Sequence, residues 1–510
     1  MPTLRTFDYM LNEKVFQTGS QTLRGSHDII PGKPVKVNHQ RQLLMDSYVV
    51  DDLNGCKRTV HQPHKHPDNP LVRGAAGQDS GPTSWGNIVR DPNTGLFRIW
   101  TIATDPQLSA RFGGKGPIGV VNGVYFESDD GLEWRRPNLR MFEHYGNKDN
   151  NVFLHAGLDN LYVLPLPERM HGQGRYGMVY CNNLSPDAVL PDDTHAMRNF
   201  ISFSDDGISW TDAAENPVWY GRTDTNNCII YNPERDVFMM YRRATINAGE
   251  IRRIAYSESA DLISWTQPVT IITSDELDPI YLYGMPVSNY NGVYFGYLQC
   301  LHSHPDFRNY SLDDGKDFKM DTQLAWSRDG VSWERHPKRP TFIPNSAPDK
   351  DSYDWGMVKG MANMIEVGDD VYIYYGGHPR LHPPGMAESK RNQGICLATV
   401  KRDRLVSVDA GDYGGFMLTK PMAYSGGDLH INARTDGNGF IRVAVREGEG
   451  VRDGEWPEGW RFNRSSAFSG DSLDHVMAWE GSGSLGSFPS TTMRLHFWLE
   501  NAELYSFWFA

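Results

Sequence analysis

The chain has 510 residues, of which 39% are hydrophobic and 12% aromatic, so it can bury a large core and is expected to form two domains. Its formal net charge of -13 argues against a nucleic-acid-binding surface, because such surfaces need an excess of Lys and Arg. The sequence contains no membrane-length apolar run and no apolar segment typical of a signal peptide near its start. We therefore expect no membrane association, and a cytoplasmic location for the chain as given, or an extracellular or periplasmic one if a signal peptide has been removed.

Residues 1–40 are expected to be an amino-terminal extension, and "RQLLMDSYVV" (41–50) is an apolar candidate strand. A pattern with five units follows. Each unit has a candidate strand, a turn rich in Gly, Asp, Asn or Pro, and a second strand rich in β-branched and aromatic residues. The second strands are "LFRIWTIA" (96–103), "RYGMVYC" (175–181), "VFMMYRRA" (237–244), "VYFGYLQC" (293–300) and "VYIYYGG" (371–377).

A second motif runs in step with the first and supplies two further strands in each of four units. Its copies are "YFESDDGLEW" (125–134), "ISFSDDGISW" (201–210), "AYSESADLISW" (255–265) and "AWSRDGVSW" (325–333). The fifth unit has "GICLATVKRDRLVSV" (394–408) in this place, and residues 41–50 are expected to add its outer strand. Five units of four antiparallel strands predict an all-β fold with a five-bladed β-propeller, in which radial repetition protects the sheet edges.

The character of the sequence changes after about residue 415. Segments such as "DLHINARTDGNGFIRVAVRE" (428–447) alternate apolar and polar residues without the blade motif, which predicts a carboxy-terminal β-sandwich. We therefore expect a propeller over residues 41–425 and a sandwich domain over residues 426–510.

Strand order predicts which face of the propeller carries chemistry. The start of each innermost strand and the loop between the second and third strands share one face, whereas the Ser-acid-Gly-Trp hairpins lie on the other. The hairpin aspartates are therefore interpreted as turn formers, with the Trp packing between blades. These aspartates are Asp129, Asp130, Asp205, Asp206 and Asp329.

Acids open four of the five innermost strands and are expected to meet around the central tunnel. The candidate catalytic residues are Asp79, Asp224, Asp278 and Asp354. The candidate substrate-binding residues are Trp85, Glu276, Tyr281, Arg242, Arg243, Trp355 and His378. Paired carboxylates beside aromatic rings suit glycosidic cleavage, because one acid protonates the leaving oxygen and another acts as base or nucleophile. For each acid taken alone, capping of a loop at a strand start remains an open alternative.

No cofactor and no metal are predicted. The pair His302 and His304, with Asp306, contains metal-ligand residue types, but a His-x-His spacing favours polar loop contacts. The five cysteines are far apart and show no paired spacing, so they are expected to be buried thiols.

The arrangement from "RQLLMDSYVVDD" through the "SDDGISW" blades to "GGDLHINARTDGNGFIRVAVRE" resembles the glycoside hydrolases of families 43 and 32, the arabinanase, levansucrase and invertase superfamily. The sequence lacks the W-M-N-D-P-N-G and E-C motifs of family 32. The resemblance implies an exo-acting glycosidase on a furanoside or another non-reducing-end sugar, with Asp79 or Asp224 as nucleophile or base. Asp278, Glu276 or Asp354 would then be the acid or the residue that tunes it.

Two alternatives stay open, namely a lyase or phosphorylase on the same fold and a non-catalytic carbohydrate-binding propeller. The expected partner is a carbohydrate, with no nucleic acid and no membrane, and formation of a homo-oligomer is left open.

Overall fold

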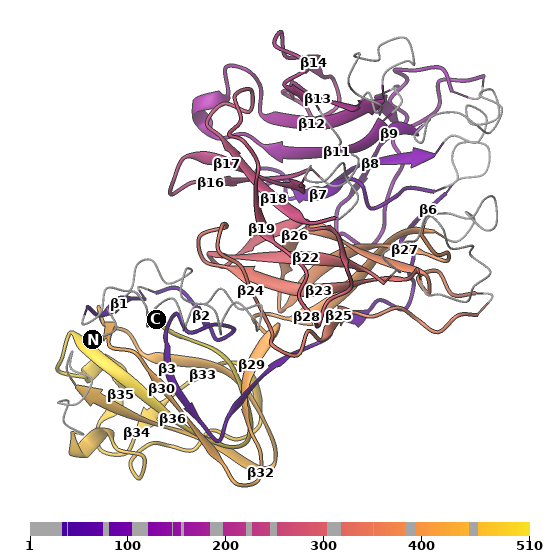
Figure 1. Cartoon of the computed structure of the whole chain (residues 1–510). Helices are drawn as coiled ribbons and strands as arrows, with labels where there is room; N and C mark the ends of the chain where they lie inside the picture. Colours follow the sequence, from indigo (N-terminus) through magenta and orange to yellow (C-terminus); the bar gives the residue numbers. More distant parts are fainter. Residues whose placement is uncertain are drawn as a thin grey trace, which may run out of the picture.

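The computed structural model describes residues 33–37, 39–74, 81–104, 121–144, 146–154, 158–183, 197–220, 227–244, 252–302, 318–349, 351–382, 393–447 and 457–510. Over these ranges the regular structure consists of strands and three short 3-10 helices. None of these helices is long and apolar enough to cross a bilayer. Figure 1 shows two bodies, a larger one built from the middle of the chain and a smaller one that holds the carboxyl terminus.

The larger body contains five antiparallel blades in chain order. Blade I has β7 (Asn87–Arg90), β8 (Phe97–Thr104), β9 (Val121–Ser128) and β10 (Val152–Leu154). Blade II has β11 (Leu158–Pro165), β12 (Tyr176–Asn183), β13 (Met197–Ser204), and the short outer strands β14 (Thr211–Asp212) and β15 (Trp219–Tyr220). Blade III has β16 (Cys228–Asn232), β17 (Val237–Arg243), β18 (Ile254–Ser259) and β19 (Val269–Ile272).

The last two blades follow the same plan. In blade IV the inner position is divided between β20 (Tyr281–Gly284) and β21 (Val287–Tyr290), followed by β22 (Val293–Leu301), β23 (Met320–Ser327), β24 (Glu334–Arg335) and β25 (Thr341–Ile343). Blade V has β26 (Met357–Val367), β27 (Asp370–His378) and β28 (Gly394–Lys401). The prediction of a five-bladed all-β propeller is confirmed.

Contacts between inner strands close the blades into a ring. Asn87 of blade I exchanges two hydrogen bonds with the backbone of Val163 in blade II, at 2.5 and 2.9 Å. The Val287 N–H of blade IV donates to the Cys228 Sγ of blade III at 3.2 Å. Asn363 of blade V has a left-handed backbone conformation, with a φ of 78°. Its backbone N–H donates to Ser288 of blade IV, and its side-chain amide donates to the carbonyl of Ile88 in blade I. These bonds fix the inner strands around one axis.

The four hairpins act as scaffold, as the sequence predicts. One carboxylate oxygen of Asp130, Asp206 and Asp329 accepts the backbone N–H groups two and three residues ahead, at 2.7–2.9 Å. Each motif Trp also packs against an aromatic ring of the preceding blade, which joins neighbouring blades. These pairs are Trp134 with Tyr374, Trp210 with Phe153, Trp265 with Trp219, and Trp333 with Tyr241.

The outer strand of blade V comes from the amino-terminal part of the chain, but not from residues 41–50. Strands β5 (His64–Lys65) and β6 (Val72–Arg73) pair with β28. Residues 41–50 instead supply β2 (Gln42–Leu43), which pairs with β36 of the smaller body. The expectation for residues 41–50 is wrong because Leu44 and Val49 are buried in the core of the second body.

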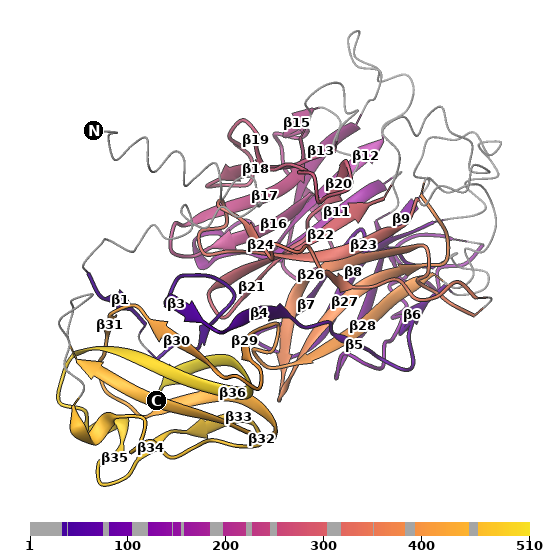
Figure 2. The same cartoon turned by 60° about the horizontal axis from the view of Figure 1, so that its bottom comes forward.

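The second body is built on a ten-stranded sheet that uses both ends of the described chain. The amino-terminal strands are β1 (Val35–Lys36), β2, β3 (Val50–Asn54) and β4 (Lys57–Val60). The carboxy-terminal strands are β29 (Val406–Ala410), β30 (Gly415–Thr419), β31 (Met422–Ala423), β32 (Leu429–Glu447), β33 (Asp471–Val476) and β36 (Thr492–Phe509). Residues 35–60 and 406–423 therefore belong to this sheet, outside the range 426–510 expected for the second domain. Figure 2 shows β3 and β4 beside β30 and β29.

Asp403 ties the two bodies together. Its buried carboxylate accepts hydrogen bonds from the hydroxyl of Tyr290 in blade IV and the hydroxyl of Ser506 in β36, both at 2.8 Å. Arg41 lies 2.9 Å from the same carboxylate and 2.7 Å from Glu366 of blade V. The junction is therefore a network of charged hydrogen bonds whose members come from five separate segments of the chain.

Candidate functional site

In every blade the connection from the second to the third strand is longer than the connection from the first to the second strand, which lies on the opposite face. On the hairpin face, β7 and β8 are joined by a tight turn in which Asp91 accepts the N–H groups of Asn93 and Thr94. On the opposite face, where the inner strands begin, long segments join second to third strands in all five blades. They are residues 105–120, 184–196, 244–253, 302–319 and 379–393. Long connections around a set of strand starts are typical of a functional face.

Three blades bring side chains together at the start of their inner strands. Trp85 precedes β7, Tyr283 lies on β20, and Lys359 lies on β26 between them. The Lys359 ammonium is 4.8 Å from the Trp85 ring centroid and 5.0 Å from that of Tyr283. Lys359 is buried, so the cation–π contacts occur in a largely desolvated place where they are strongest. We call Trp85, Tyr283 and Lys359 the axial cluster.

Two arginines of blade III lie beside the axial cluster. The Arg243 guanidinium lies 5.5 Å from the Tyr283 ring centroid, and that of Arg252 lies 4.5 Å from it. Arg252 also lies 5.9 Å from the ring of Tyr281 and donates a 3.3 Å hydrogen bond to His382 Nε2. The site therefore concentrates positive charge beside aromatic rings, in contrast to the acidic chain as a whole.

Burial, together with the positive charge, favours the neutral form of the neighbouring imidazoles. Burial, and then the charges of Arg252, Lys359 and Arg243, hold the pKa of His382 well below its usual value. Burial and the nearby Lys359 do the same to the pKa of His378, at the end of β27. Neutral imidazoles can accept a hydrogen bond from a sugar hydroxyl as well as donate one.

The two predicted arginines point to different places. Adjacent residues of a strand face opposite sides, so Arg243 reaches Tyr283 whereas Arg242 packs over Trp219 of blade II, at 5.2 Å. Burial lowers the pKa of Arg242 to about 10. Arg243 therefore lies beside the axial cluster, whereas Arg242 lies between blades II and III. Tyr281, buried beside Arg252, also belongs to this region.

Asp278 is held in a buried ion pair with the outer strand β24 of blade IV. Its two carboxylate oxygens accept bonds of 2.6 and 2.7 Å from Arg335 of β24, and Arg339 lies 3.6 Å away. The side chains of Asp278 and Arg335 are 0% and 4% exposed. Glu276, in the same turn, is exposed to solvent. This geometry supports a structural role for Asp278, in anchoring the connection from blade III to blade IV.

Asp354 is also enclosed by partners from its own blade, on the outer strand β5 and on β27. Lys65 of β5 lies 2.6 Å from its carboxylate, and the Tyr375 hydroxyl donates to the same oxygen at 3.2 Å. The side chain is fully buried. Trp355, the next residue, is half-buried just before β26. Asp278 and Asp354 therefore each have their own cationic partner, and the contacts of the two carboxylates do not overlap.

Asp79 and Asp224 lie outside the described residues, as do His304 and Asp306. Their neighbours in sequence are placed. Gly81 accepts a 3.1 Å bond from the side chain of Gln393, and the Asn227 amide donates to Asn199 at 2.8 Å and Asn160 at 3.3 Å. Among the residues that the structure describes, no group of three metal-ligating side chains is placed to hold an ion. All five cysteines are free and four of them are buried.

Sequence reasoning missed two residues on this face. Arg252 lies two residues before β18, the third strand of blade III. Third strands start on the same face as inner strands, so the position of Arg252 in the sequence did indicate this face. Asp321, near the start of β23, bonds His302 Nε2 at 2.9 Å. His302 thus has a carboxylate partner that is distant from it in sequence, which its own local motif could not reveal.

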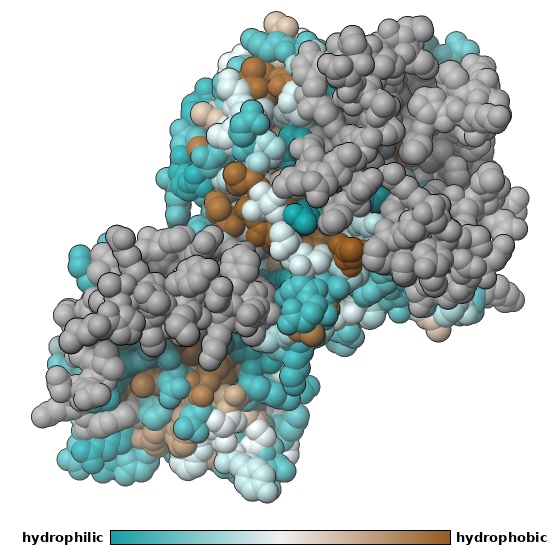
Figure 3. Space-filling model, in the orientation of Figure 1, coloured by the Kyte–Doolittle hydropathy of each residue, from teal (hydrophilic) through white to brown (hydrophobic). Residues whose placement is uncertain are grey.

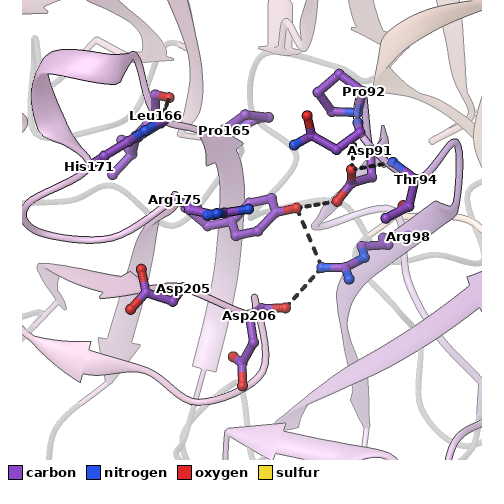
Figure 4. A pocket seen from close by; sticks show the side chains of 12 residues that line it. Asp91, Pro92, Thr94, Arg98, Pro165, Leu166, His171, Arg175, Asp205 and Asp206 are labelled. Atoms are coloured by element: carbon purple, nitrogen blue, oxygen red, sulfur yellow. Dashed lines mark hydrogen bonds between the residues drawn. The ribbon is translucent and has the colours of Figure 1, made fainter.

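A separate pocket of about 540 Å³ opens on the hairpin face between blades I and II. Figure 4 shows that its polar groups bond one another. The Tyr176 hydroxyl donates to Asp91 at 2.6 Å, and Arg98 donates to the backbone oxygen of Asp206 at 2.9 Å. Asp205 and Asp206 line this pocket, but Asp206 is engaged by its own turn. The pocket lies on the scaffold face and is distinct from the axial cluster.

These features define a five-bladed propeller joined to a second β-sheet domain, with an aromatic and cationic cluster where the inner strands start. No family model matches the chain, and no curated protein matches it. Among solved structures, it is similar to an N-acetylgalactosamine deacetylase from F. plautii, with 16% identity, a TM-score of 0.41, and coverage of 69% of this chain and 96% of that one.

It is also similar to two further solved structures. The catalytic domain of the Coprinopsis cinerea GH62 alpha-L-arabinofuranosidase shows 9% identity and a TM-score of 0.39, with 68% of this chain and 98% of that chain covered. A fructofuranosidase from Schwanniomyces occidentalis shows 11% identity and a TM-score of 0.40, with 86% and 96% covered. The chemistry of this chain therefore has to be inferred from its own residues.

Proposed function

We propose that the chain is a glycoside hydrolase that acts from the non-reducing end of a furanoside or a related sugar. The observation that supports this most is the axial cluster, in which Trp85, Tyr283 and Lys359 from three blades meet on the face with the long connections. Aromatic rings offer a stacking surface for the C–H face of a sugar, and the cation and neutral imidazoles suit its hydroxyl groups.

Trp85 adds a donor to this surface. Its ring lies beside Lys359, and its indole N–H is buried with no acceptor among the residues that the structure describes. An unsatisfied buried donor costs free energy unless a ligand or water accepts from it. A sugar oxygen bound at the cluster is a suitable acceptor.

The catalytic carboxylates of this proposal are Asp79 and Asp224. Asp224 is three residues from Asn227, so covalent geometry limits their Cα separation to about 11 Å. Asp79 is two residues from Gly81, which limits that separation to about 7 Å. Asp278 and Asp354, already held by Arg335 and Lys65, are assigned to the scaffold. In the reaction one carboxyl group would protonate the leaving oxygen, and the other would activate water or attack the anomeric carbon.

The cationic groups favour one alternative, a lyase or phosphorylase that acts on an anionic sugar or uses phosphate. Arg243, Arg252 and Lys359 all lie within 5.5 Å of the Tyr283 ring centroid. Such a cluster can hold a sugar carboxylate or a phosphate by charge-assisted hydrogen bonds.

A panel of aryl glycosides and plant or algal oligosaccharides tests the proposal, assayed with and without phosphate, for the wild type and Asp224→Asn. We expect hydrolysis by the wild type and a loss of at least 100-fold in the variant, with an unchanged unfolding midpoint. Phosphate-dependent turnover or an unsaturated product would favour the alternative. Binding without turnover would favour a carbohydrate-binding propeller, and full activity in Asp224→Asn would remove that residue from the mechanism.

A further inference from the structure

The second domain has an aromatic pocket on the outer face of its main sheet. Phe416 of β30 is directly opposite Trp498 of β36, and Ala444 of β32 is opposite His496. Their sequence neighbours Met417, Phe497, Val443 and Val445 point the other way, into the core of the domain. This alternation shows that the rings are on the outer face, where packing of the core does not require them.

The rings surround a hollow of about 650 Å³. The Phe416 ring centroid is 5.2 Å from His496, 5.9 Å from Phe462 and 6.0 Å from Trp498. Ala444 forms part of the lining, and its small side chain leaves the space that a larger residue would fill. Phe416 is 37% exposed, which makes it one of the few large hydrophobic side chains at the surface of the described chain. The volume is typical of a small-molecule site.

The chemistry of the lining favours a sugar over other small ligands. Arg461 and Asn463 line the pocket beside the rings and are exposed, so they can bond hydroxyl groups at its mouth. A cationic ligand, which aromatic cages also bind, is disfavoured by Arg461 and by Arg442, whose guanidinium is bonded to the Phe462 carbonyl at 3.3 Å. A purely apolar ligand would leave the polar residues at the mouth without a role.

We propose that this aromatic pocket binds a sugar ring of an oligosaccharide or polysaccharide, as a site separate from the axial cluster. Trp498 and Phe416 would stack on the C–H faces of the ring, and Arg461 and Asn463 would bond its hydroxyl groups. The class of ligand rests on the proposed function of the propeller. The site would increase the local concentration of substrate chains near the enzyme, by the same principle that makes linked binding sites bind more tightly.

Affinity electrophoresis in gels that contain soluble arabinan, levan, xylan or pectic polysaccharide tests this proposal. The proteins are Asp224→Asn, which serves as a background that does not consume the ligand, and the same protein with Trp498→Ala, Phe416→Ala or Tyr413→Ala. Tyr413 is a fully exposed aromatic residue that does not line the pocket, so it is the matched control. We expect at least one polysaccharide to retard the background protein, and Trp498→Ala and Phe416→Ala each to weaken that binding at least fivefold. Tyr413→Ala should change it less than twofold.

The same substitutions in the active protein separate this proposal from that for the propeller. Turnover of a small aryl glycoside should stay within twofold of the wild type in Trp498→Ala. If the wild type hydrolyses no glycoside but Trp498→Ala still abolishes retardation, the proposed function fails and the pocket proposal stands. Unchanged retardation in both folded pocket variants would overturn the pocket proposal. So would a dimer in sedimentation that dissociates in Trp498→Ala, because a second copy would then cover the pocket.

Discussion

Replacement of Asp278 by Asn tests whether this buried acid is scaffold or catalyst. The substitution leaves the buried Arg335 guanidinium without the carboxylate that now bonds it at 2.6 and 2.7 Å. Removal of one partner of a buried pair costs about 3–5 kcal/mol, because the other charge remains buried. Asp275 lies 4.0 Å from Arg335 and can compensate in part, so we expect the lower end, about 3 kcal/mol.

Urea unfolding, followed by tryptophan fluorescence and circular dichroism, measures this loss as a lower midpoint at an unchanged slope. The double variant Asp278→Leu/Arg335→Met should recover most of the stability, because it removes both charges. Asp129→Asn is the surface control, since that carboxylate is 76% exposed beside Arg135, and its midpoint should hardly move. Turnover per folded Asp278→Asn molecule should equal that of the wild type. A midpoint near the wild-type value, or a large loss of turnover in folded protein, would refute the structural assignment.

Three further predictions address other parts of the molecule. Burial, with Asp46 nearby, raises the pKa of Glu334 to about 8, so its contribution to stability is full below about pH 4.5 and is lost as the pH rises to about 8. Between these two pH values the urea midpoint of Glu334→Gln should therefore fall less than that of the wild type. An equal fall in both proteins would contradict the raised pKa of Glu334. Tyr374→Phe should lower stability by about 1–2 kcal/mol without affecting turnover, because its buried hydroxyl donates at 2.7 Å to Gly131 of the next blade; an unchanged midpoint would show that this bond contributes nothing. Lys359→Met should reduce kcat/KM at least tenfold at an unchanged midpoint, and full activity in a glycosidase assay would place the substrate elsewhere.

Much of the fold is predictable because its signals are local. Each hairpin repeats a Ser and an acid whose bonds stay within three residues, and each motif Trp follows at a fixed distance. The pairing partners of short strands are less predictable. Residues 41–60 and 406–423 alternate in a way that fits either sheet. Only their pairing with β36, directly or through β29 and β30, decides between the two sheets.

The site is predictable as a face but less so as a set of residues. By the rule that inner strands and third strands start on the same face, Arg243 is expected near the inner strand of blade IV, and the structure places it beside Tyr283. The same rule would have pointed to Arg252, which lies beside Tyr281. The role of an acid depends on partners distant in sequence. Asp278 meets Arg335 and Asp354 meets Lys65 only after the blades are assembled, and no local pattern announces either pair.

A crystal structure of Asp224→Asn with a bound oligosaccharide that the wild type cleaves would test the central claim most directly. We predict a terminal sugar ring stacked against Trp85 or Tyr283, with an oxygen within hydrogen-bonding distance of Lys359 and of residue 224. A ring bound in the hairpin-face pocket beside Tyr176 and Asp206, with the axial cluster empty, would contradict it.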